Sequence, residues 1–151
     1  MRKQIMNRTR MLMAAAMLCG CAALQAAPTC SLASLSGNYG FTITGQILSG
    51  PSAGPVAGVA LTTYNGSGGL TQVDHVVHNG QIPPEEWRSA TGSYTLNADC
   101  TGTMQLIFSD GSPNLNLHIV VDLLAGQIHS VVDGDVAITS IGVRQGIVWI
   151  F

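Results

Sequence analysis

The stretch LNLHIVVDLL, residues 115–124, alternates between apolar and polar side chains. Successive side chains of a β-strand point to opposite faces, so this period of two predicts a strand with one buried face. The apolar face carries Leu115, Leu117, Ile119, Val121 and Leu123. The opposite face carries Asn116, His118, Val120 and Asp122.

The same period recurs along the chain, and no sustained helical period follows residue 30. Further strands are predicted at residues 37–47, 57–64, 70–78, 91–97, 101–108, 128–132 and 136–144. Turn residues such as Asn65-Gly66 and Asp110-Gly111 separate them. Eight strands joined mostly by short turns favour an all-β, antiparallel up-and-down barrel, because closure removes exposed strand edges. A β-sandwich is the alternative.

The N-terminus has the layout of a bacterial export signal. Arg2, Lys3, Arg8 and Arg10 precede an uncharged run at residues 11–24. This run is shorter than the roughly 20 residues that a membrane-spanning helix needs. We therefore expect a signal peptide at residues 1–26, followed by a single domain at 27–151 that is periplasmic or secreted.

A second interpretation of this segment is a lipobox. Leu18, Gly20 and Cys21 occupy the positions that such a motif requires, with Cys19 between them. Lipidation of Cys21 would make the protein an outer-membrane lipoprotein, tethered to the membrane through that anchor.

Without the signal, the domain is acidic. It keeps two basic residues, Arg88 and Arg144, and eight acids, so its formal charge is 2 − 8 = −6 against −2 for the whole chain. Two arginines cannot cover a phosphate backbone, which argues against nucleic acid as a partner. They also argue against electrostatic binding to anionic lipid. The sequence does not determine the oligomeric state.

Two cysteines remain in the domain, Cys30 and Cys100. An even pair in an oxidising compartment predicts a disulfide. A bridge that closes a loop of about 70 residues contributes on the order of 4 kcal/mol by the loop-entropy model. A redox or metal pair is the weaker interpretation, because the two cysteines lack a CxxC spacing.

The segment LSGNYGF, residues 35–41, resembles the first strand of calycin-type barrels, the lipocalin and avidin group. In that group a Gly-x-Trp pair opens the strand; here Tyr39 takes the place of the tryptophan. Allene-oxide-cyclase-like barrels are similar at the level of the fold. The resemblance implies a barrel whose open end accepts a small apolar or amphipathic molecule. The residues expected to contact it are Tyr39, Phe41, Trp87, Tyr94, Met104, Phe108 and His118.

Trp87 is the candidate lid, since it lies in the longest connection, after Pro83 and Pro84. The histidines favour a structural interpretation over a metal site: His75 and His78 are three apart on a strand and point to opposite faces. No metal, cofactor or catalytic residue is predicted. A non-enzymatic role is favoured, either ligand binding or a structural or interaction module.

Two alternatives remain open. One is a small barrel enzyme of the cyclase or isomerase type, with His118, His129 or Asp122 as the acting groups. The other is an eight-stranded outer-membrane barrel, because the apolar tail GIVWIF, residues 146–151, is similar to the terminal strand of such barrels.

Overall fold

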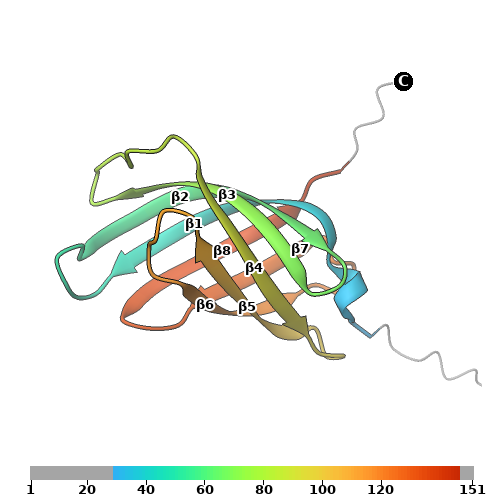
Figure 1. The fold of residues 1–151 in the computed structure, drawn as a ribbon. Helices are drawn as coiled ribbons and strands as arrows, with labels where there is room; N and C mark the ends of the chain where they lie inside the picture. Colours follow the sequence, from blue (N-terminus) through green and yellow to red (C-terminus); the bar gives the residue numbers. More distant parts are fainter. Residues whose placement is uncertain (1–28, 147–151) are drawn as a thin grey trace, which may run out of the picture.

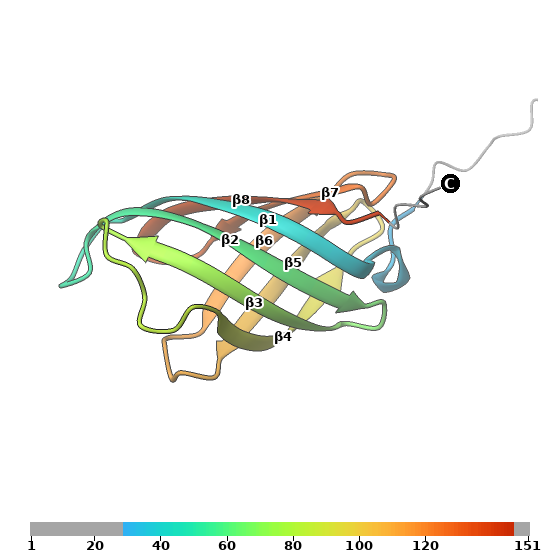
Figure 2. The same cartoon turned by 90° about the horizontal axis from the view of Figure 1, so that it is seen from above.

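A computed structural model describes residues 29–146, which form one closed barrel of antiparallel strands in chain order (Figure 1). The strands are β1 Ser36–Ile47, β2 Gly54–Asn65, β3 Gly69–His78, β4 Arg88–Leu96, β5 Thr101–Phe108, β6 Leu115–Val121, β7 Gln127–Val132 and β8 Val136–Arg144. β8 pairs with β1, from Tyr39↔Arg144 to Ile47↔Val136, and this closes the ring. Figure 2 shows β8, β1, β2 and β3 side by side in this order. The predicted up-and-down barrel is confirmed, and the β-sandwich alternative is wrong.

Two strand boundaries differ from the sequence prediction in ways that matter. β6 ends at Val121, because Asp122 forms a turn in which its carboxylate accepts the Gly126 backbone N–H at 2.6 Å. Leu123 and Leu124 are therefore exposed, although Leu123 was expected on the buried face. β4 begins at Arg88 rather than at residue 91, because Arg88 continues the ladder with Asp74 of β3.

The strands alternate between an apolar interior and a largely polar exterior. In β5 the inner positions are Gly102, Met104, Leu106 and Phe108, and the outer positions include Thr101, Thr103 and Gln105. The other strands follow the same period of two, which places one continuous core inside the ring.

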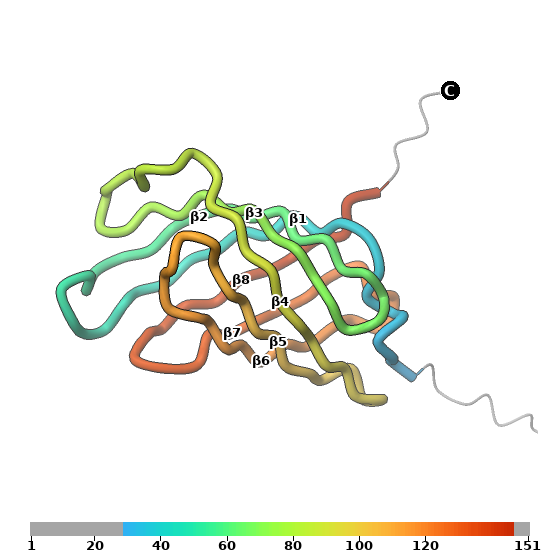
Figure 3. The backbone as a smooth tube through the Cα atoms, in the orientation of Figure 1, coloured from blue at the N-terminus to red at the C-terminus, as the bar shows by residue number. Residues whose placement is uncertain are grey.

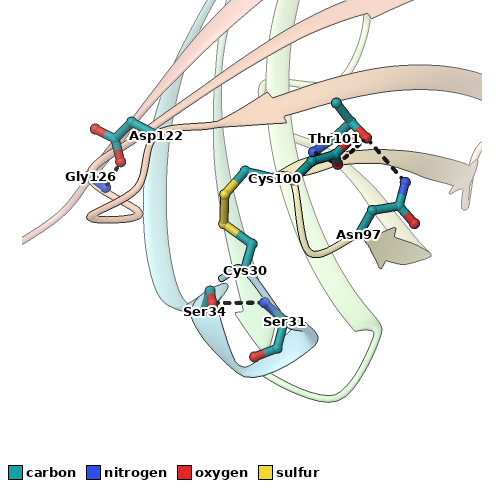
Figure 4. The surroundings of a disulfide bond; sticks show 9 residues. Cys30, Ser31, Ser34, Asn97, Cys100, Thr101, Asp122 and Gly126 are labelled. Atoms are coloured by element: carbon teal, nitrogen blue, oxygen red, sulfur yellow. Dashed lines mark hydrogen bonds between the residues drawn. A yellow bond between two sulfur atoms is a disulfide. The ribbon is translucent and has the colours of Figure 1, made fainter. Parts of the chain in front are cut away.

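One end of the barrel is closed by the chain before β1. The short 3₁₀ helix η1, Leu32–Ser34, leads into Leu35, which is completely buried. The predicted disulfide is confirmed: Cys30 is bonded to Cys100, the residue before β5, with Cα atoms 5.0 Å apart (Figure 4). This bridge holds η1 against the barrel rim.

Three buried tyrosines fill the closed end. The Tyr64 ring meets those of Tyr39 and Tyr94 edge to face, with centroids 5.4 and 5.2 Å apart. The Tyr39 hydroxyl donates to the Ala125 carbonyl at 2.6 Å, so its polar tip is satisfied. The Arg144 guanidinium lies over the Tyr39 ring, with Cζ 5.1 Å from the centroid. The barrel is solid in this half.

Burial changes the pKa values of two of these tyrosines, and this makes the stability of the barrel depend on pH in the alkaline range. Burial raises the pKa of Tyr64 well above its ordinary value, and the neighbouring Tyr39 and Tyr94 add to the effect. Burial also raises the pKa of Tyr39, which Arg144 partly offsets.

We predict that the free energy of unfolding falls above about pH 10, where tyrosine ionises in the unfolded chain but not in the barrel. When folding raises the pKa of a tyrosine, its contribution to the free energy of unfolding is fully present below the pKa of the unfolded chain. That contribution is lost as the pH rises from the pKa of the unfolded chain to the pKa of the folded protein. The loss is up to about 1.4 kcal/mol per pH unit for each such tyrosine. Denaturant unfolding at a series of alkaline pH values measures it. Tyr64→Phe should show a shallower slope; equal slopes would contradict this account.

Candidate functional site: an apolar cavity with a buried ion pair

The opposite half of the barrel is hollow. Its mouth is framed by the loops 48–53, 79–87, 109–114 and 133–135, which lie at the left in Figure 3, away from η1. Below them lies a cavity of about 430 Å³. Its apolar lining includes Phe41, Ile43, Leu106, Phe108, Leu117 and Ile138. The interior of an eight-stranded barrel is wide enough either to be filled by side chains or to hold one small ligand. In this barrel, side chains fill the half next to η1, and the half at the mouth has room for a ligand.

A carboxylate and a guanidinium face each other in the cavity wall. Asp74 of β3 is 3 % exposed and lies directly across the ladder from Arg88 of β4. Arg88 Nε donates to Asp74 Oδ1 at 3.0 Å, and Arg88 Nη2 donates to Oδ2 at 3.0 Å. This two-point geometry is the strongest that an arginine and a carboxylate can form.

The ion pair continues into two further buried polar side chains, the Gln72 amide and the Thr62 hydroxyl. Gln72 Nε2 donates to Asp74 Oδ2 at 3.2 Å, and Thr62 Oγ1 donates to Gln72 Oε1 at 2.8 Å. The chain of contacts therefore runs from β2 through β3 to β4. Both oxygens of Asp74 have donors, as a buried charge requires.

The other side of Arg88 faces the mouth. Its guanidinium lies over the Phe108 ring, with Cζ 3.7 Å from the centroid, and its side chain is 22 % exposed. Nη1 donates to Ser112 Oγ across a long 3.4 Å. Ser112 in turn donates to Asp110 through its backbone N–H and its hydroxyl. These two bonds lower the pKa of Asp110, and the charge of Arg88 adds to the effect.

Three of the predicted ligand contacts line this cavity, namely Phe41, Met104 and Phe108. Tyr39 and Tyr94 belong instead to the tyrosine cluster of the closed end. Trp87 is 51 % exposed, and its ring lies outside the barrel beside that of His75, with the two ring centroids 6.1 Å apart. His118 is on the outer face, where Nδ1 lies 2.9 Å from Asp133 Oδ1. Ligand contact by these seven residues stays a prediction.

The alternative catalytic groups also lie away from the cavity. His118 and His129 occupy outer, exposed positions of β6 and β7, and Asp122 forms the turn between these strands. His78, by contrast, lines the cavity. Among residues 29–146, no three His, Cys, Asp or Glu side chains are arranged to hold a metal ion.

Sequence reasoning missed the polar row Thr62, Gln72, Asp74 and Arg88. One signal was present: Gln72 and Asp74 share the parity of the buried Leu70, so a strand pattern places both inside. Arg88 gave no such signal, because it follows the proline-rich connection and joins β4 only through its pairing with Asp74.

No protein-family model, curated protein or solved structure matches this chain. The eight-stranded antiparallel barrel is thus shown by its own topology, and the calycin resemblance remains one of architecture. Within residues 29–146, no helix has the length and apolar character to cross a membrane.

We predict that Arg88→Met destabilises the barrel by about 3–5 kcal/mol, because it leaves the Asp74 carboxylate buried without its partner. Adding Asp74→Asn should recover much of the loss, since the remaining group is neutral and still meets Gln72. Urea unfolding of the wild-type, single and double variants at neutral pH measures both effects. An unchanged single variant, or a double variant as unstable as the single, would contradict the assignment.

Proposed function

We propose that this protein is an exported, non-enzymatic barrel that binds one small, predominantly apolar molecule in the cavity at its mouth. The observation that carries the proposal is the cavity itself. Its volume of about 430 Å³ lies within the range of small-molecule sites, roughly 300–1,000 Å³. Aliphatic and aromatic side chains with a few convergent polar groups are the usual lining of such sites.

Two independent features support export. The Cys30–Cys100 disulfide is compatible with an oxidising compartment. The basic N-terminus and apolar run have the layout of a signal. The predicted signal at 1–26 and the lipidation candidate Cys21 lie outside the described residues. Both alternatives, a free periplasmic or secreted protein and a lipoprotein, therefore remain predictions from the sequence.

The distribution of polarity supports an aqueous surrounding for the barrel. Outer-membrane barrels carry apolar residues outside and polar residues inside. Here the interior is the apolar side, and the outer face is mixed: it carries Thr42, Thr44 and Thr63 together with exposed apolar side chains such as Val59 and Leu61. The tail at 147–151, which suggested a membrane barrel, lies outside the described residues. The arrangement favours a barrel whose apolar binding surface is internal.

Binding is favoured over catalysis for a similar reason. Of the ionisable side chains that line the cavity among the described residues, Asp74 and Arg88 are committed to each other through two hydrogen bonds, which leaves His78 as the one further such group. The suggested catalytic groups His118, His129 and Asp122 lie on the outside or in a turn. A purely structural module would not need the space that the mouth half leaves empty.

We predict that N-phenylnaphthylamine, an uncharged apolar fluorophore, binds the protein and that Ile138→Trp weakens this binding at least about tenfold by occupying the space. Ile138 lines the cavity. Ile141→Trp is the matched control, because Ile141 is on the same strand but on the exposed outer face. Fluorescence titration with direct excitation of the probe measures all three proteins.

The control should bind the probe like the wild type. If both tryptophan variants weakened probe binding equally, or if Ile138→Trp did not weaken it, the probe would bind outside the cavity. No binding to the wild type would overturn the proposed function.

A further inference from the structure

We propose that the cavity selects an uncharged amphipathic molecule, whose carbonyl or hydroxyl oxygen accepts hydrogen bonds from Arg88 at the mouth. Its hydrocarbon part would lie in the apolar space below. The inference rests on the proposed function and goes further by naming the chemistry of the ligand. Three observations support it: the free donors of Arg88, the local charge, and the place of Arg88 along the barrel axis.

Arg88 has donors to spare. A guanidinium carries five N–H groups. Within the described residues two of these donate to Asp74 at 3.0 Å, and a third reaches Ser112 only at 3.4 Å, beyond the usual range of about 2.7–3.2 Å. The remaining N–H groups belong to Nη1 and Nη2. These are the strongest donors that line the cavity, and a ligand oxygen can accept from them.

The charge of Arg88 is already balanced. Asp74 holds it through two bonds, and Asp110 lies behind Ser112 on its other side. A carboxylate ligand would therefore bring a further negative charge to one cation that already has two acidic neighbours. The Asp74 carboxylate is 3 % exposed, so water screens its repulsion of a second carboxylate poorly, and the domain as a whole carries a formal charge of −6. A neutral acceptor gains the hydrogen bonds without this repulsion.

The position of Arg88 fixes the direction of the ligand. Arg88 is the first residue of β4, and Ser112 is in the loop 109–114 at the mouth. Toward the closed end the wall is formed by Met104, which accepts the Tyr64 hydroxyl at 3.3 Å. The oxygen of the ligand is thus placed near solvent and its hydrocarbon near the floor. Because Phe108 supports the guanidinium plane, little side-chain ordering is needed on binding.

The test is displacement of N-phenylnaphthylamine by decanol, decanoate and decane at neutral pH. On the wild-type protein, decanol should displace the probe at a concentration about tenfold lower than decanoate, because decanoate brings a second negative charge beside Asp74. This comparison needs no variant. Decanoate binding as tight as, or tighter than, decanol would overturn the proposal.

A variant then locates the effect. In Arg88→Met with Asp74→Asn, the binding of decanol should weaken about tenfold while that of decane is unchanged, because decanol loses the charged donors of Arg88 and decane makes no hydrogen bond. The matched control is His118→Gln with Asp133→Asn, which replaces the two side chains of a 2.9 Å Nδ1–Oδ1 contact on the outer face and should change the binding of neither ligand. Unchanged decanol binding in the cavity variant would overturn the proposal. If the probe fails to bind the wild type at all, the proposed function itself has failed.

Discussion

The pairing of β1 with β8 is the constraint on which the rest of this structure depends. Once the ring is closed, all inward side chains share one interior of fixed width, and their volumes decide where it is filled. Gly142 on β8 illustrates the fit, since a Cβ there would collide with the Phe41 ring. The tyrosines fill one end, and smaller side chains such as Val56, Ala60 and Val132 leave space at the other.

The disulfide and the tyrosine cluster hold and fill the closed end, and the cavity lies in the other half of the barrel. An ion pair in the wall of that half is unexpected on grounds of stability, because replacing a buried pair by apolar residues is often neutral or stabilising. Both oxygens of Asp74 are nevertheless satisfied, and we infer that the pair has a use other than stability. Holding a guanidinium at a fixed place beside an apolar cavity is a use that fits its geometry.

The sequence predicted the architecture well because the signals are local. A period of two reports which face of a strand is buried, as it did for Tyr39, Phe41 and Ile43, and the cysteine pair reported the bridge. The site was harder, because it depends on register between strands. Asp74 and Arg88 are fourteen residues apart, and their contact follows from the β3–β4 ladder rather than from any motif. Trp87 was expected over the mouth, but the same ladder starts after it and leaves its ring beside His75.

One half of this barrel holds an apolar cavity with the paired Arg88 guanidinium in its wall. A high-resolution crystal structure of the protein with bound N-phenylnaphthylamine would test whether this cavity takes up a ligand. We expect ring density inside the barrel between Phe41, Leu106 and Ile138, with Arg88 still paired to Asp74. An interior filled by repacked side chains, with the probe on the outer surface, would contradict it.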